Sequence, residues 1–171
     1  MATLEERFQA SHRVRARLGR VGPDGISLPV QPQHDIAPDL ERIIGEACFG
    51  LIWDRPGLSL EQRSMATISV LIALGRERQL KGHIEGGLNV GLPADQIVEV
   101  FIHLFFYLGA PTVNTALAVA NEVFQERGIK VEPQRVYDPS EDLDQLFRRG
   151  QAKRREILED PETETSGDLA E

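Results

Sequence analysis

Three side chains in the apolar middle of this 171-residue chain are of types that perform chemistry: His83, His103 and Tyr107. His83 lies in the segment 77–90, where apolar residues recur at helical spacing, and it falls on the flank of that apolar face. A histidine in a mostly apolar cavity can act as a general acid or base, because the ordinary pKa of imidazole is close to the working pH. The alternative is a partly buried histidine with satisfied hydrogen bonds at a helix or subunit contact. Glu85 falls on nearly the opposite side of the same helix, so no His83–Glu85 catalytic pair is predicted.

Arg63 and the pair formed by His103 and Tyr107 are further candidates for such a site. His103 and Tyr107 share one face of the hydrophobic helix expected at 94–109. Arg63 stands one turn before Thr67, on the less apolar side of another helix. A polar line on an apolar helix is more often solvated or turned toward a neighbouring subunit than catalytic. An arginine at a helix start is likewise more often half of an ion pair than an anion clamp.

Other common kinds of site are excluded by what the chain lacks. Its four histidines are scattered and form neither HxxxH nor HExxH, so no protein-bound metal is predicted. There is no GxSxG motif, and Gly82, Gly86 and Gly87 do not stand between a strand and a helix as a phosphate loop would. Cys48 is the single cysteine, which rules out a disulfide or CxxC pair within the chain. It is expected to be a small core residue.

The composition is that of a globular protein with one main domain. The chain is 41% hydrophobic and 27% charged, and its formal net charge of −8 favours neither nucleic acid nor an anionic membrane as a partner. The N-terminus lacks the apolar region of a signal peptide, and no apolar run reaches the roughly 18 residues of a membrane span. We therefore expect a cytoplasmic protein without nucleic-acid or membrane partners.

Hydrophobic periodicity predicts an all-α fold, a compact helical bundle, because no segment shows the alternation of a strand. Changes in composition divide the chain into four parts: an N-terminal helix and extended arm (1–38), a helical core (39–128), a linker and charged C-terminal helix (129–158), and an acidic tail expected to be disordered (159–171). The arm is expected to wrap around a partner subunit. Ser140 is expected to cap the C-terminal helix.

Local signals in the core predict where its helices begin and which faces they bury. Ser59 followed by Gln62 predicts a capping box at a helix start. Gly86 and Gly87 each disfavour the helix of His83 by about 1 kcal/mol relative to alanine, which is tolerable if they allow close helix packing or leave room for a ligand. Apolar residues at i, i+3, i+4, i+7 and i+8 predict one further buried stripe: Leu40, Ile43, Ile44, Ala47 and Cys48.

The middle of the chain contains short motifs in a fixed order: FGLIWDRPG at 49–57, ALGR at 73–76, His83 with Gly87 and Gly91 behind it, and EV..H at 99–103. Over residues 58–128 this pattern resembles the carboxymuconolactone decarboxylase family. That family includes an alkylhydroperoxidase D-like branch with the motif CxxCxxxH, whose cysteine positions fall on Arg76 and Gln79 here. Because both thiols are absent, the resemblance implies the decarboxylase branch rather than peroxidase chemistry.

The resemblance implies a homo-oligomer, a trimer or a hexamer, that works without a cofactor on a small anionic organic substrate. The namesake reaction removes CO2 from γ-carboxymuconolactone in aromatic-compound catabolism, and the lactone ring itself accepts the electron pair. His83 would then donate the proton or stabilise the oxyanion, and Arg63 would bind the retained carboxylate. A second donor would come from His103 or Tyr107. The substrate-binding residues would be Trp53, Phe49, Thr67, Phe105, Phe106 and Tyr107.

Two alternatives to this lyase stay open on the sequence alone. One is a non-catalytic ligand-binding or structural oligomer on the same fold. The other is a lyase, isomerase or cyclase recruited to another small-molecule pathway. An antioxidant function is a weaker hypothesis, because Cys48 alone would have to carry it.

Overall fold

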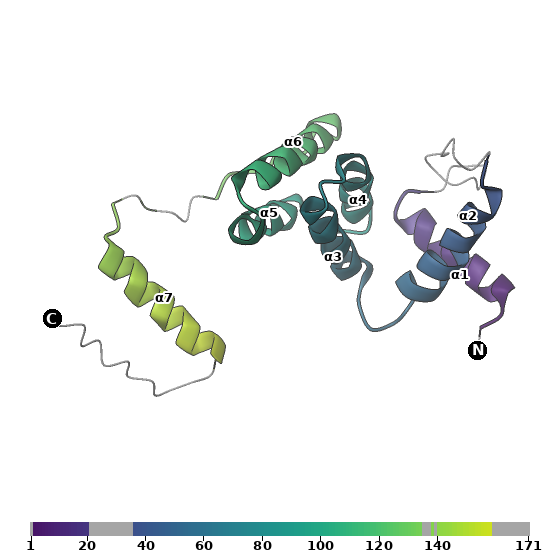
Figure 1. The fold of residues 1–171 in the computed structure, drawn as a ribbon, viewed down its shortest axis with the longest axis horizontal. Coiled ribbons are helices and arrows are strands. Elements are labelled where there is room, and N and C mark those ends of the chain that lie inside the picture. Colours follow the sequence, from purple (N-terminus) through teal and green to yellow (C-terminus); the bar gives the residue numbers. More distant parts are fainter. Residues whose placement is uncertain (1, 21–35, 135–137, 139, 159–171) are drawn as a thin grey trace. The chain divides into compact units, whose positions relative to one another are not determined.

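The computed structural model describes residues 2–20, 36–134, 138 and 140–158 of the chain. Every regular element in these ranges is a helix, which confirms the all-α prediction (Figure 1). The chain divides into two compact units, Met1–Glu132 and Pro133–Glu171. Most of the predicted arm, 21–35, and the predicted tail, 159–171, lie outside the described residues.

The first unit begins with α1 (Leu4–Arg17), which packs along the helical segment that follows the arm (Figure 1). α1 starts at a capping box, in which Thr3 N–H donates to Glu6 at 2.7 Å and Glu6 N–H donates to Thr3 Oγ1 at 3.2 Å. α2 (Pro38–Ile43) leads directly into η2 (Ile44–Trp53), a π-helix. The two ends of the arm are therefore held together by a pair of packed helices.

The π-helical geometry of η2 changes which side chains are buried. Gly45, Phe49 and Trp53, spaced by four, form its buried line. Leu40 and Ile43 are 42% and 58% exposed, so the stripe predicted from the sequence is wrong at these positions. Leu40 and Ile43 lie on α2, and Ala47 in η2 itself is exposed as well. In η2 the hydrogen bonds from residue i to i+5 widen the turn beyond the 3.6 residues that the prediction assumed.

The main core is enclosed by α3 (Leu60–Ala73), α4 (Glu77–Asn89), α5 (Ala94–Leu108) and α6 (Ala110–Glu126). α3 starts at the predicted capping box, with Ser59 N–H donating to Gln62 Oε1 at 2.9 Å and Gln62 N–H donating to Ser59 Oγ at 3.2 Å. Fully buried side chains come from each of these helices: Ile68, Ile72, Leu80, Ile84, Ile97, Phe101 and Val123. The burial of these side chains fixes α4, and with it His83, against its neighbours.

Gly86 and Gly87 allow α4 to approach its neighbours closely. A methyl group on Gly86 would lie 3.3 Å from Leu18 Cδ2, and one on Gly87 would lie 3.3 Å from Leu92 Cδ2. These separations are tighter than ordinary contact between carbon atoms. Of the two explanations offered by the sequence, close helix packing is therefore the one that applies, and the space for a ligand lies elsewhere on α4.

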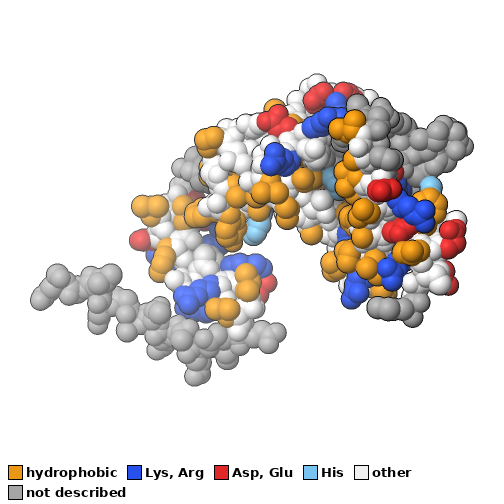
Figure 2. All heavy atoms as spheres, turned by 45° about the vertical axis from the view of Figure 1, so that its right-hand side comes forward, with side chains coloured by type: hydrophobic (Ala, Val, Ile, Leu, Met, Phe, Trp, Pro, Cys, Tyr) orange, Lys and Arg blue, Asp and Glu red, His pale blue; other side chains and the backbone are white. Residues whose placement is uncertain are grey.

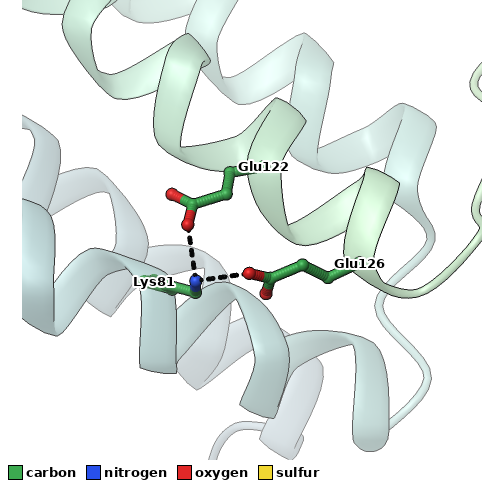
Figure 3. A network of polar contacts seen from close by, with 3 residues as sticks. All are labelled: Lys81, Glu122 and Glu126. Atoms are coloured by element: carbon green, nitrogen blue, oxygen red, sulfur yellow. Dashed lines mark hydrogen bonds and ion pairs between the residues drawn. The ribbon is translucent and has the colours of Figure 1, made fainter.

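An ion-pair network ties α4 to α6 (Figure 3). Lys81 Nζ donates to Glu122 at 2.8 Å and to Glu126 at 2.9 Å. The hydrogen bonds to both carboxylates raise the pKa of Lys81, so its ammonium stays charged. Because surface ion pairs contribute little to stability, the network serves mainly to orient α4 against α6.

α5 leaves much of its apolar surface uncovered. Ile97 and Phe101 are its buried residues, whereas Ile102, Phe105 and Phe106 are 56%, 49% and 95% exposed. On the face drawn in Figure 2, hydrophobic side chains likewise lie at the surface. Phe105 and Phe106 therefore do not form an apolar wall inside the first unit.

The second unit contains α7 (Leu143–Leu158), none of whose residues is buried. Asp142 rather than the predicted Ser140 caps this helix, since Asp142 Oδ1 accepts the Gln145 N–H at 2.8 Å. Ser140 instead donates its hydroxyl to Asp138 at 2.6 Å. Among the described helices none is long and apolar enough to cross a lipid bilayer.

Candidate active site

A pocket of about 500 Å³ lies against α4, within the range of roughly 300–1,000 Å³ that small-molecule sites occupy. Its walls come from three places: α4, the residues that follow α1, and the C-terminal end of α6. The described residues that line it are Arg78, Gln79, Gly82, His83, Glu85, Asn89, Leu18, Gly19, Arg20 and Arg127. The pocket therefore depends on segments that are far apart in the sequence.

Gly82 is part of the pocket wall contributed by α4. It has no side chain, and His83 and Glu85 project on either side of it. The Nη2 atom of Arg20 lies 3.7 Å from the point where a Cβ atom of residue 82 would be. Glu85 falls on nearly the opposite side of α4 from His83, but both line this pocket, with Gly82 between them.

His83 is a neutral imidazole in this structure. Burial, followed by the positive charge of Arg20, lowers the pKa of His83 from 6.5 to about 3. The sequence-based expectation of a pKa near the working pH is therefore wrong, since it took no account of Arg20. A neutral imidazole can donate one N–H bond and accept one, but it carries no acidic proton at pH 7.

Aromatic side chains from η2 form a wall beside His83, although neither of them is among the residues that line the pocket. The ring centroid of Trp53 lies 6.1 Å from that of His83, and Phe49 lies 5.7 Å from Trp53. Both aromatic residues are buried, at 8% and 5% exposure. The structure thus brings together three residues that the sequence analysis proposed for one site, although they come from two separate helices.

Arg20 is the residue that the sequence analysis missed. Its guanidinium lies 6.0 Å from the centroid of the Phe49 ring, and burial lowers its pKa. In the described part of the chain, no carboxylate lies within ion-pair distance of Arg20, whereas the neighbouring Arg15 pairs with Glu41. The only local signal was the basic residue at the start of a Gly- and Pro-rich arm, which does not reveal what the arm touches.

The other predicted site residues lie apart from this pocket. Arg63 donates from Nη2 to the Arg55 carbonyl oxygen at 2.8 Å, and Thr67 is partly buried on α3. His103 and Tyr107 contact each other on the exposed side of α5, with ring centroids 5.3 Å apart. None of these four residues is among those that line the pocket.

Cys48 lies near the aromatic wall but is poorly suited to nucleophilic chemistry. It is partly buried, and burial raises the pKa of its thiol despite the opposing charges of Arg15 and Arg20. A raised pKa keeps the sulfur protonated, and the thiol is much less reactive than the thiolate. Among the described residues, no three His, Cys, Asp or Glu side chains come together in a way that could hold a metal ion.

The fold and the pocket define a helical protein whose pocket is lined by a neutral histidine and an arginine, with two buried aromatic side chains nearby. The chain belongs to the carboxymuconolactone decarboxylase family, which its residues 38–122 match. This confirms the family resemblance noted in the motifs around His83.

Three relatives show how far the similarity extends. The chain is 34% identical to 4-carboxymuconolactone decarboxylase of Acinetobacter baylyi over 128 residues, which are 75% of this chain and 94% of that protein. It is 30% identical to nitrosuccinic acid decarboxylase of Metarhizium robertsii over 86 residues, 50% of this chain and 60% of that protein. It is 25% identical over 99 residues, 57% of this chain and 74% of the relative, to an uncharacterized 15.0 kDa protein of Paracoccus denitrificans. Two of these names support a decarboxylase-like function for this chain.

Proposed function

We propose that the protein is a cofactor-independent carboxy-lyase that acts on a small anionic compound of the carboxymuconolactone type. The observation that carries this proposal is the neutral His83 beside Arg20 in one pocket, with the Trp53 ring 6.1 Å from the His83 ring. Family membership and the two relatives named as decarboxylases support the reaction type.

The two named substrates share a chemical property that makes a cofactor unnecessary. In 4-carboxymuconolactone the carbon that bears the leaving carboxylate is conjugated through a double bond to the lactone carbonyl. In nitrosuccinic acid the nitro group is bonded to one of the carbons that bear a carboxyl group. In both compounds, the electron pair released with CO2 can move onto oxygen atoms of the substrate itself. The protein needs only to bind the anion, exclude water from the leaving carboxylate and stabilise the developing oxyanion.

In the proposed reaction, the bond between the ring carbon and the leaving CO2 breaks, and its electron pair moves through the double bond to the lactone carbonyl oxygen. The N–H group of neutral His83 donates a hydrogen bond to that oxygen as its negative charge develops. Water then protonates the ring carbon next to the carbonyl, which gives the decarboxylated lactone with its double bond shifted. Two roles were left open for His83, proton donor and oxyanion stabiliser. The proposed reaction uses the second, because an imidazole with a pKa of about 3 is not an acid at pH 7.

The direct test is CO2 release by the purified protein from 4-carboxymuconolactone, with nitrosuccinate as a second substrate. We expect turnover of the lactone, followed through its ultraviolet absorbance and through the CO2 produced. Release from nitrosuccinate alone would move the substrate class to open-chain acids. No release from either compound, with protein that is folded by circular dichroism, would exclude the proposed function.

The pH dependence of kcat/KM gives a separate test of the role of His83. Because the pKa of His83 is about 3, its neutral form is already complete at pH 5 and above. We therefore expect kcat/KM to be flat between about pH 5 and about pH 8. If the imidazolium were the required form, kcat/KM would fall tenfold per pH unit across that range. An inflection near 6.5, the ordinary pKa of histidine, would contradict a neutral, buried His83.

We also propose that the uncovered face of α5 contacts a second copy of the chain. Ile102, Phe105 and Phe106 fall within about one third of the helix circumference, which is the width of a typical buried stripe. Glu99 and His103 lie one turn apart along one edge of this stripe and are both exposed.

Replacing Phe106 with serine should reduce the mass of the assembly measured by light scattering. Phe106 is 95% exposed in the single chain, so the change leaves the core intact and removes only intermolecular contact. Leu4→Ser is the matched control, because Leu4 is 58% exposed on α1 and should leave the mass unchanged. An unchanged mass in Phe106→Ser would show that something other than a second copy covers α5.

A further inference from the structure

We propose that Arg20 is the specificity residue of the pocket and binds the carboxylate that the substrate retains after CO2 has left. The inference rests on the proposed function for the identity of the substrate, and on the geometry of the pocket for the position of the charge. It gives the segment after α1 a role in recognition that the family motif around His83 does not cover.

The backbone at Arg20 is held against α4 by specific contacts. Gly19 adopts a φ of +69°, which turns the chain, and the Arg20 N–H donates to the Arg15 carbonyl oxygen at 2.8 Å. The Leu18 carbonyl oxygen accepts a hydrogen bond from Asn89 Nδ2 at 3.0 Å. The positive φ favours glycine at residue 19, and a Cβ atom there would also overlap the side-chain amide of Asn89. The position of Arg20 relative to α4 is therefore determined by packing.

The side chain of Arg20 reaches over the glycine of α4 toward the histidine. Its Nη2 atom is 3.7 Å from the position of a Cβ on Gly82, and both residues line the pocket with His83. Arg78 and Arg127 also line the pocket, and Arg127 Nη1 donates to Asn89 Oδ1 at 2.7 Å. Within the described residues, the guanidinium of Arg20 makes no ion pair, so its donors are available to a bound anion.

The chemistry of decarboxylation decides which carboxylate Arg20 should hold. The leaving carboxylate becomes neutral CO2, so a cation bound to it would stabilise the ground state more than the transition state and slow the reaction. The other carboxylate keeps its charge throughout, and a guanidinium on it contributes to binding without raising the barrier. With the retained carboxylate on Arg20, the leaving carboxylate is not bound by that cation, and its desolvation in the pocket favours loss of CO2.

The kinetic test compares Arg20→Gln and Arg20→Lys with the wild-type protein on 4-carboxymuconolactone. A charge-assisted hydrogen bond contributes about 1.5–3 kcal/mol, so Arg20→Gln should raise KM by roughly 10- to 150-fold. Because the retained carboxylate is bound equally in the ground state and in the transition state, kcat should change by less than about threefold. Arg20→Lys should recover part of the loss in KM. Arg17→Gln removes the same charge from an exposed position on α1, outside this pocket, and should leave KM unchanged.

Binding of an unreactive analogue tests Arg20 independently of turnover. Muconolactone keeps the carboxymethyl group but lacks the carboxylate that leaves, and its methyl ester removes the remaining charge. Trp53 is the single tryptophan and lies 6.1 Å from His83, so its fluorescence reports on occupancy of the site. The wild-type protein should bind the acid at least tenfold more tightly than the ester, and Arg20→Gln should bind the two alike.

The two experiments separate the possible failures. If no CO2 is released but the protein binds the acid more tightly than the ester in an Arg20-dependent way, the proposed reaction is excluded. The anion site at Arg20 is then still supported. Equal binding of acid and ester by the wild-type protein, or no binding of the acid, would overturn the role of Arg20. A loss of kcat in Arg20→Gln with an unchanged KM would also overturn it, because that result places the charge on the reacting group.

Discussion

His83→Ala should reduce kcat for decarboxylation by about 10²- to 10³-fold, the usual effect of removing one donor to a developing oxyanion. The N–H of the neutral imidazole is the donor assigned to that oxygen, and alanine leaves no group that could replace it. His83→Gln should recover part of the activity, because an amide N–H can donate from a similar position. Steady-state kinetics on 4-carboxymuconolactone give the measurement.

The fold should survive this substitution. His83 is partly buried at the edge of the pocket, and the neighbouring core residues Leu80 and Ile84 do not depend on it. The circular dichroism spectrum and the mass in solution should therefore match those of the wild-type protein. His12→Ala is the matched control: it removes a partly buried imidazole that contacts Phe8 on α1 and should retain full kcat. Wild-type kcat in His83→Ala would exclude His83 from the reaction.

Gly50→Ala should destabilise the protein by about 1–3 kcal/mol or more, the range for an added carbon in a closely packed contact. A Cβ on residue 50 of η2 would overlap the carbonyl oxygen of Arg7 in α1 and lie 2.8 Å from its carbonyl carbon. The obstacle is backbone, so no change of rotamer can relieve it, and α1 must move away from η2. Urea unfolding followed by circular dichroism gives the free energy of unfolding.

The same substitution should weaken substrate binding, because α1 leads directly to Arg20. We expect KM for 4-carboxymuconolactone to rise while kcat changes little, as proposed for Arg20→Gln. Gly57→Ala is the control for the loss of a glycine, since a Cβ there meets nothing within 4 Å. If Gly50→Ala unfolds at the same urea concentration as Gly57→Ala, the backbone of Arg7 does not lie against Gly50 as closely as the structure has it.

The sequence by itself determined the features that depend on neighbouring residues. Helical periodicity identified the helices, the Ser59–Gln62 capping box located the start of α3, and the motifs around His83 identified the family. Even at this level the wrong cap was chosen for α7, because Asp142 and Ser140 are both good capping residues and only the chain path decides between them.

The tertiary structure decided the chemistry of the site. Periodicity places His83 on one flank of its own helix, but it cannot say which distant segment covers that flank. The end of α1 supplies that cover, and Arg20 both lowers the pKa of His83 and brings a positive charge to the pocket. Gly82 became part of the pocket lining, and Gly86 a packing contact, for the same reason. A glycine in a sequence records only a missing side chain, whereas packing decides whether a neighbour or a cavity takes up the space.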